Sequence, residues 1–274
     1  METYQPGSGG INSFASFPFS SYKAGWLEYV PEDTSKRYPC VIDAHGAGFT
    51  SHDPSMLNEG LAKYLNQGNK PNFVGICIAG GKVVQPMEFC NMIEYASQHP
   101  YVDPNKIIIG GLSYGAIHTW NTVVYSTASD RYGTYDILPF TNKLCGFYSL
   151  AGKVRNDYDK DLVERFPGIA ECGNSDTVTK PSSIANLRDK CSTVIFHNYV
   201  GLGHGGGIWD RFWYGGNDNT LLTDWNGIES DPFMSFDNFL ALCTGDVVSP
   251  PPDPEICEFT QEEICKLKEF AKTL

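Results

Sequence analysis

The sequence has no apolar run of 18 residues, the length that a membrane-spanning helix needs. Its first ten residues also lack the basic start and the apolar stretch of a signal peptide. We therefore expect no membrane span. The compartment stays open: either the protein is intracellular or its signal has been removed, and secretion is the favoured interpretation.

Positive charge is scarce. The 20 lysines and arginines stand against 32 aspartates and glutamates, which gives a formal net charge of −12 at pH 7. No basic cluster offsets this balance, so we expect neither a nucleic acid nor an anionic membrane as partner. The charge favours neutral or cationic substrates over polyanions. The oligomeric state does not follow from it.

The nine cysteines show no metal-ligand spacing, because neither a C-x-x-C pair nor a cysteine and histidine pattern occurs. We expect no metal site and no cofactor. An odd number of cysteines leaves at least one unpaired within the chain. Cys243, Cys257 and Cys265 lie near the C-terminus and could include a disulfide if the protein is secreted.

Short apolar runs alternate with helix-like segments along most of the 274 residues. This alternation is typical of an α/β fold, here with a mostly parallel central sheet, helices on both faces and no large cap domain. The expected strands are 25–31, 39–44, 73–79, 107–111, 144–150, 169–172 and 192–199. The expected helices are 56–65, 87–96, 116–125 and 182–188.

A proline-rich stretch at 247–254 marks the end of this pattern. We therefore assign residues 1–246 to one α/β domain and residues 247–274 to a proline-rich linker and a C-terminal helix. The sequence Thr260-Gln261-Glu262-Glu263 is a capping box that would start this helix. The helix could dock on the main domain or begin a truncated linker or partner-binding module.

The most informative motif is Gly111-Leu112-Ser113-Tyr114-Gly115, which follows a β-branched run and precedes a helix-like segment. A strand, this motif and a helix are typical of a nucleophile elbow, a sharp turn that exposes the serine hydroxyl. Glycine is needed two residues to either side because a side chain there would clash with the neighbouring strand and helix. We predict that Ser113 is a nucleophile.

A serine hydroxyl needs a base to remove its proton, and the base needs an acidic group to orient it. The last expected core strand leads into a glycine-rich loop that contains His204, and the strand before it leads to Asp176. The chain order Ser113, Asp176, His204 is the order in which the nucleophile, the acid and the base follow one another in proteins with this type of elbow. The reserve candidates for the acid are Glu171, Asp157 and Asp210.

A tetrahedral intermediate also needs backbone N–H donors aimed at its oxyanion. One predicted donor is the N–H of Tyr114, directly after the nucleophile. The other should come from the loop that ends the strand at 39–44, with Ala47 favoured and Gly48 second. His45 would organise that loop rather than act as a second base.

These motifs resemble those of α/β-hydrolases. The chain is most similar to the esterase branch that includes polyhydroxyalkanoate depolymerase-like, feruloyl or acetyl-xylan esterase-like and dienelactone hydrolase-like enzymes. The resemblance covers roughly residues 22 to 243 and implies a Ser113–His204–Asp176 triad that hydrolyses its substrate through an acyl-enzyme. It rests on His45-Gly46, Val102-Asp103-Pro104, Gly111 to Gly115, Gly173-Asn174-Ser175-Asp176 and Gly203-His204, which stand in the order seen in that superfamily.

An aromatic run follows His204, and residues 208–225 hold three of the five tryptophans. A loop after the base borders the mouth of the site, so its aromatics could stack on an acyl group or a sugar. We expect Trp213, Tyr214 and Trp225 to form this wall, whereas Trp209 could equally pack the last helix onto the sheet. The expected substrates are short-acyl or aryl carboxylic esters, either small molecules or esters carried on plant polysaccharides.

Three alternatives remain beside a serine esterase. The chain could be a small serine peptidase or aminopeptidase-like hydrolase, or a catalytically dead α/β-hydrolase that acts as a binding protein. The segment from Gly201 to Gly206 also fits G-x-G-x-x-G, a dinucleotide-binding pattern. We set that pattern aside because it lies at the end of the expected sheet and no apolar helix is expected after it.

Overall fold

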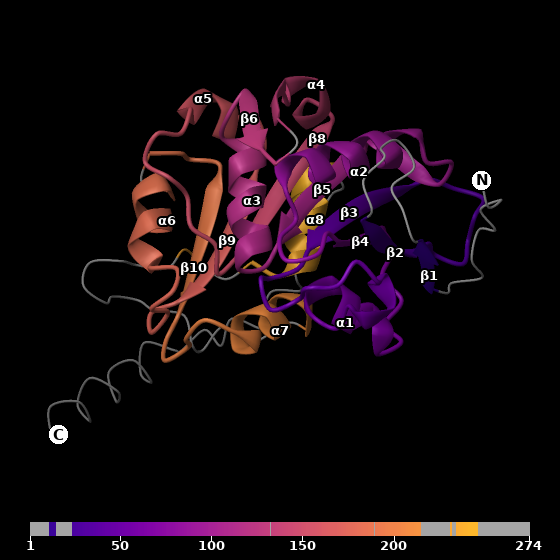
Figure 1. Ribbon diagram of the computed structural model, residues 1–274, viewed down its shortest axis with the longest axis horizontal. Helices are drawn as coiled ribbons and strands as arrows, with labels where there is room; N and C mark the ends of the chain where they lie inside the picture. The colour runs from indigo at the N-terminus through magenta and orange to yellow at the C-terminus, as the bar shows by residue number, and fades with distance from the viewer. Residues whose placement is uncertain are drawn as a thin grey trace, which may run out of the picture.

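A mixed sheet of eight strands forms the centre of the molecule (Figure 1). The computed structural model describes residues 11–14, 24–131, 133–188, 190–214, 231 and 234–245. The strands lie in the order β1-β2-β4-β3-β5-β8-β9-β10. They are β1 (Ile11–Phe14), β2 (Gly25–Tyr29), β3 (Tyr38–Ala44), β4 (Val74–Ala79), β5 (Val102–Gly111), β8 (Leu144–Leu150), β9 (Gly168–Gly173) and β10 (Val194–Tyr199).

The sheet is antiparallel only at its β1 end, where β1 pairs with β2 and β2 with β4. The pairs from β4 through β3, β5, β8 and β9 to β10 are parallel. Parallel neighbours need crossover connections, usually helices that cover the faces of the sheet. The carboxyl ends of these strands therefore meet at one edge, which we call the catalytic edge.

Helices cover both faces of the sheet; α3 and α6 lie in front of it in Figure 1 and α8 behind it. Successive strand residues face opposite sides, so Ile107 and Ile109 join one core cluster and Ile108 the other. The first cluster packs against α2, α3 and α6, and the second against α1, α7 and α8. The helices are η1 (Pro54–Met56), α1 (Gly60–Asn66), α2 (Pro86–Gln98), α3 (Tyr114–Val123), α4 (Leu138–Thr141), α5 (Lys160–Val163), α6 (Pro181–Arg188), α7 (Gly206–Tyr214) and α8 (Phe236–Thr244).

The predicted α/β architecture is confirmed, and the expected strands and three of the four expected helices lie within a few residues of their predicted positions. The exception is the helix expected at 56–65. The 3₁₀ turn η1 starts at Pro54, but the extended backbone of Leu57, with ψ of 122°, separates it from α1. The elbow strand is also longer than expected, because β5 begins at Val102 rather than after the turn at 102–106.

Two further elements of the structure have no counterpart in the sequence analysis. The hairpin β6 (Thr127–Asp130) and β7 (Gly133–Asp136) is mostly exposed, so it has little hydrophobic alternation to reveal it. Helix α8 carries clear signals that were missed: Ser235 caps its start by accepting from the N–H of Asn238, and Gly245 ends it with φ of 68°.

The expectation that no helix follows Gly201–Gly206 is wrong, because α7 starts at Gly206. Its buried residues Ile208, Phe212 and Trp213 recur at helical spacing and face the core. The three glycines at 205–207 hid this helix, since glycine disfavours helices intrinsically. The dinucleotide pattern is still set aside because it lies at the end of the sheet: it follows β10, the edge strand of the sheet that the described residues form.

The described residues contain no large cap: between β5 and β8 they add only the β6–β7 hairpin, α3 and α4. None of the described helices is long and apolar enough to cross a membrane. Cys243 is a free thiol, whereas Cys257 and Cys265 lie outside the described residues. The proposed boundary at 246/247 and the C-terminal helix lie outside them as well.

Candidate active site

Ser113 lies on the sharp turn between β5 and α3, at the catalytic edge of the sheet. Its backbone has φ of 54° and ψ of −113°, a conformation that residues with a side chain rarely adopt. A Cβ atom at Gly111 would lie 2.5 Å from the carbonyl oxygen of Ala44, and one at Gly115 would lie 2.2 Å from it. The steric reason for both glycines is therefore confirmed.

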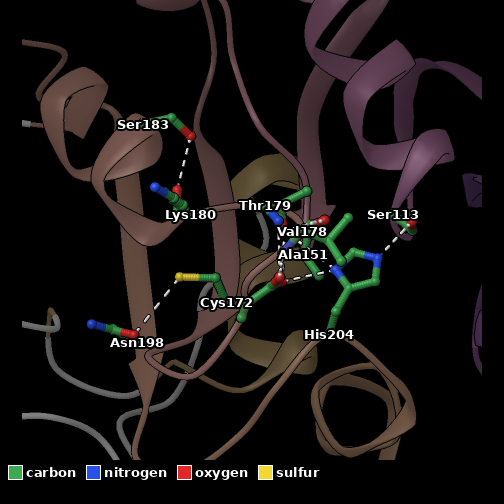
Figure 2. A network of polar contacts seen from close by, with 10 residues as sticks. Ser113, Ala151, Cys172, Val178, Thr179, Lys180, Ser183, Asn198 and His204 are labelled. Atoms are coloured by element: carbon green, nitrogen blue, oxygen red, sulfur yellow. Dashed lines mark hydrogen bonds and ion pairs between the residues drawn. The ribbon is translucent and has the colours of Figure 1, made fainter.

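His204 lies between Ser113 and Asp176, so the three predicted residues come together. Figure 2 labels Ser113 and His204 and marks the bond between them. Its Nε2 is 2.8 Å from Oγ of Ser113, and its Nδ1 is 2.8 Å from Oδ2 of Asp176. With an ionised carboxylate at Asp176, the ring proton lies on Nδ1, and Nε2 is left to accept from the serine hydroxyl. This is the arrangement that a Ser-His-Asp site requires.

The carboxylate of Asp176 is buried and held by the turn that follows it. Its Oδ1 accepts the N–H groups of Val178 and Thr179, both at 2.8 Å, and its Oδ2 lies 2.6 Å from the hydroxyl of Thr179. Burial opposes ionisation, but the hydrogen bonds from Thr179, His204 and Val178 outweigh it and hold the pKa of Asp176 below its usual value. Asp176 is therefore charged at neutral pH.

Thr179 was missed by the sequence analysis, although a threonine three residues after an aspartate in a turn is a detectable signal. Besides Asp176, its hydroxyl lies 2.9 Å from the carbonyl oxygen of Ala151, and it is 3.4 Å from Nδ1 of His204. Ala151 itself has φ of 52° and directly follows β8. Thr179 thus links the turn that follows Asp176 to Ala151, the residue after β8.

The loop after β3 lies beside the nucleophile. A Cβ atom at Gly46 would be 3.3 Å from Cβ of Ser113. His45 is buried, and its ring donates from Nδ1 to the carbonyl oxygen of Gly46 over 2.7 Å. Burial lowers the pKa of His45 to about 4, so the ring is neutral at pH 7. Its bond to Gly46 stabilises the loop. Tyr114 is the first residue of α3, where an N–H has no acceptor within the helix.

Two acidic side chains that the sequence analysis did not single out lie beneath this loop. Asp43 is buried; it accepts the hydroxyl of Tyr148 at 2.6 Å and the N–H of Leu61 at 3.0 Å. Burial, with a smaller contribution from the charge of Glu59, raises the pKa of Asp43 to about 7, although the hydrogen bonds from Tyr148 and Leu61 oppose the shift. An oxygen of Glu59 would lie 3.7 Å from a Cβ atom at Gly46.

The raised pKa of Asp43 predicts a pH-dependent stability. Because the folded pKa lies above that of the unfolded chain, the contribution of Asp43 is fully present below about pH 4 and is lost as pH rises through about 7. We expect Asp43→Asn to remove this loss, which is on the order of 3 kcal/mol between pH 4 and pH 7. Urea unfolding of both proteins across this range measures it.

Asp33→Asn is the control for Asp43→Asn. The exposed carboxyl of Asp33 has a pKa below its usual value because the hydroxyl and N–H of Ser35 donate to it. Its contribution is therefore present above the unfolded pKa and is lost as pH falls, the opposite sign. A wild-type minus Asp43→Asn difference that stays flat from pH 4 to pH 7 would contradict the assignment.

Of the four acidic candidates, Asp176 is the one bonded to His204. Glu171 is buried and accepts from the Tyr199 hydroxyl and from Nδ1 of His197, each at 3.0 Å. The other two candidates, Asp157 and Asp210, pair with Arg155 and Lys63. Among the described residues, no three His, Cys, Asp or Glu side chains gather so that they could hold a metal ion.

No protein-family model and no curated protein sequence matches this chain. Solved structures do. A thermostable esterase superposes with a TM-score of 0.57 at 15% identity over 74% of this chain, which spans only 59% of that protein. A thermophilic esterase from the Planctomycetes species Thermogutta terrifontis gives a TM-score of 0.54 at 17% identity, covering 76% of this chain and 88% of its own. The Thermogutta terrifontis esterase 2 phosphorylated by paraoxon gives 0.54 at 16%, covering 78% and 89%.

This protein has the α/β-hydrolase fold. The sheet order, the elbow at Ser113 and the superpositions agree on it. At 15–17% identity the superpositions show that the fold is shared. The chemistry depends on the side chains of this chain.

The structure places the aromatic residues that follow His204 differently from what the sequence analysis expects. Trp209, on α7, is partly buried, and its ring centroid lies 6.2 Å from that of His204 at an angle of 87°. Its Nε1 is buried and has no acceptor among the described residues. Trp209 therefore borders the catalytic histidine candidate, whereas the sequence analysis ranked it below its neighbours.

The expected role of Trp213 in a substrate wall does not fit its position. Trp213 is 7% exposed and packs against Tyr148 and Phe236 in the core, because the helical turn of α7 directs it toward the sheet. Tyr214 is 42% exposed, but it lies against Tyr64 of α1. Trp225 lies outside the described residues.

Proposed function

We propose that this α/β-hydrolase is a serine hydrolase of carboxylic esters that works through an acyl-enzyme on Ser113. The observation that carries the proposal is the chain of two 2.8 Å hydrogen bonds from Ser113 through His204 to Asp176. His204 accepts the serine proton at Nε2 while Oγ attacks the ester carbonyl carbon. The ionised carboxylate of Asp176 stabilises the imidazolium that forms.

The negative charge that develops on the carbonyl oxygen needs donors fixed in advance. We propose the N–H of Tyr114 and that of Ala47, with Gly48 as the second choice for the loop donor. The N–H of Tyr114 suits this role because it is the first N–H of α3 and has no acceptor within the helix. The loop donors suit it because Gly46 of the same loop lies close to Ser113. The buried, neutral His45 stiffens the loop that presents them.

The second half of the reaction restores the enzyme. The imidazolium of His204 gives its proton to the leaving alcohol, and a water molecule then attacks the acyl-enzyme with His204 again as the base. No metal or cofactor takes part in the proposed cycle. The products are a carboxylic acid and an alcohol.

Labelling with a fluorophosphonate probe tests this proposal directly. We expect the probe to modify the peptide that contains Ser113, and prior incubation with a short ester to slow the labelling. The neighbouring Thermogutta esterase is phosphorylated by paraoxon, so an organophosphate is a suitable probe. No modification, or modification of another serine, would show a binding protein or a misplaced site.

We further propose short-acyl or aryl esters as substrates, including esters carried on polysaccharides. The net charge of −12 supports a neutral substrate over a polyanion. The aromatic ring of Trp209 beside His204 supports an aryl acyl group, because a planar ring can stack there or meet it edge to face.

The role of Trp209 gives a selectivity prediction. Trp209→Ala should lower the ratio of kcat/KM for p-nitrophenyl cinnamate to that for p-nitrophenyl acetate about 5-fold, since one aromatic contact contributes about 1 kcal/mol. Trp213→Phe is the matched control, because that ring lies in the core. The control should lower the melting temperature and leave the ratio unchanged. An unchanged ratio in Trp209→Ala would assign that ring to packing alone.

A further inference from the structure

A cavity of about 230 Å³ lies along one face of α3, the helix that starts at the nucleophile. Its floor consists of His118, Asn121 and Tyr125. His118 and Asn121 follow Tyr114 by four and seven positions, which places the three on one side of α3, and Tyr125 lies two residues beyond the end of this helix. Tyr114 is 46% exposed, and its ring lies 6.3 Å from that of His118. This face therefore runs from the residue beside Ser113 into the cavity, which we call the α3 groove.

The first wall of the α3 groove consists of Gln85 and Pro86, at the start of α2, and Thr127 to Ser129 of β6. The end of β6 is fixed to the catalytic edge, because Arg131 donates to the carbonyl oxygen of Gly80 at 3.3 Å and also pairs with the buried Glu88. This wall therefore has a fixed position relative to Ser113.

The second wall consists of Arg155 and Asp157, in the loop that follows β8. Tyr125 donates its hydroxyl to Asp157 at 2.8 Å, and the N–H of Asp159 donates to the carbonyl oxygen of Val124 at 3.0 Å. These bonds hold the loop against the two residues that follow α3. Both walls are therefore formed before any ligand binds.

The lining of the α3 groove mixes polar and apolar groups and is electrically neutral. Arg155 binds both oxygens of Asp157, at 3.1 and 2.8 Å, so the two charges cancel. Burial lowers the pKa of His118 to about 4, which leaves that ring neutral. The other lining groups are two amides, two hydroxyls, the ring of Tyr125 and the apolar side chains of Pro86 and Ala128. Such a lining has no free charge for an anion or a cation, and its mixture of polar and apolar groups suits a ligand that carries both hydroxyl and C–H groups.

We propose that the α3 groove binds a neutral, hydroxyl-rich group, a sugar residue in the alcohol part of the ester, while the ester carbonyl lies at Ser113. This inference rests on the proposed function for the reaction, but it adds a binding site that includes no residue of α7 in its lining. The amides of Asn121 and Gln85 suit hydroxyl groups that both donate and accept, and Tyr125 offers a ring face for the sugar's C–H groups.

The first test compares an ester that reaches the groove with one that does not. The substrates are mono-O-acetylated xylotriose and p-nitrophenyl acetate, and the readout is the ratio of their kcat/KM values. We expect Asn121→Leu to lower this ratio about 10-fold, the effect of one or two lost hydrogen bonds. Leucine has nearly the shape of asparagine and favours helices, so α3 should keep its fold.

A second variant and a control complete this comparison. Thr127→Val removes one hydroxyl from β6 without changing its shape and should lower the ratio about 3-fold. Asn105→Leu makes the Asn121 substitution at an exposed position on β5, far from the catalytic edge, and should leave the ratio unchanged. An unchanged ratio in both groove variants would overturn the proposal.

A binding measurement separates this proposal from the proposed reaction. In the Ser113→Ala protein, xylotriose binding observed by saturation-transfer NMR should be clear and should be lost on adding Asn121→Leu. Binding that persists in the double variant, or no binding at all, overturns the α3 groove as a sugar site. Wild-type protein that binds xylotriose but does not hydrolyse p-nitrophenyl acetate would instead overturn the reaction and support the groove.

Discussion

Replacing Ser113 by alanine is expected to abolish ester hydrolysis, with kcat for p-nitrophenyl acetate lower by a factor of 10⁴ or more. Without Oγ no acyl-enzyme forms, and the remaining groups of a serine site give only a small residual rate. The fold should survive, because the backbone N–H of residue 113 still donates to the carbonyl oxygen of Leu150 at 2.8 Å. Steady-state kinetics and a thermal melt measure both parts.

Ser183→Ala is the matched control for this prediction. Ser183 lies on α6, and its hydroxyl donates to the carbonyl oxygen of Lys180, directly before that helix and away from the elbow. We expect this variant to keep the wild-type kcat within about 2-fold, because it removes no group that the proposed mechanism uses. A Ser113→Ala protein that retains a tenth or more of the activity would remove Ser113 from the mechanism.

The second large effect is expected at the histidine and the acid. His204→Ala should be about as damaging as Ser113→Ala, because the members of such a site act as a unit. Asp176→Asn should lower kcat on the order of 10³-fold to 10⁴-fold, since an amide can donate to Nδ1 and so leave His204 in the wrong tautomer. Single-turnover rates with p-nitrophenyl acetate measure both.

Asp210→Asn is the control for the acid, since Asp210 pairs with Lys63 at 2.8 Å and was a reserve candidate. This pair is partly exposed, so its loss should change stability by less than about 1 kcal/mol and kcat little. If Asp176→Asn were neutral while Glu171→Gln destroyed activity in a folded protein, the acid would be Glu171. Because Glu171 is bonded to Tyr199 and His197 and not to His204, we do not expect this outcome.

The catalytic candidates could be predicted from sequence because each carries a local signal. Ser113 stands between two glycines after a β-branched strand, and Asp176 and His204 each follow a strand within a few residues. In a parallel sheet the ends of such strands meet at one edge, so short-range pattern and chain order already bring the residues together.

The predictions that were wrong or missing depend on which way a side chain points from its helix and on contacts between residues far apart in the sequence. Residues 208–214 were expected to form a loop, and a loop has no regular spacing from which the two tryptophans could be told apart. In the helix α7, Trp209 faces His204 and Trp213 faces the core. The α3 groove joins side chains from α2, α3, β6 and the loop after β8, and the exposed β6 strand left no hydrophobic pattern to reveal it. The pKa of Asp43 depends on burial, which composition does not report.

The backbone at Ser113 bears on why this position holds a serine at all. A residue with a side chain at φ of 54° and ψ of −113° destabilises the folded state by about 1–3 kcal/mol. Glycine would relieve that strain, because it has no Cβ. If thermal stability were the only demand on this chain, position 113 would drift to glycine. The presence of serine there points to a demand on the hydroxyl itself, a conclusion that follows from conformational energy without reference to any substrate.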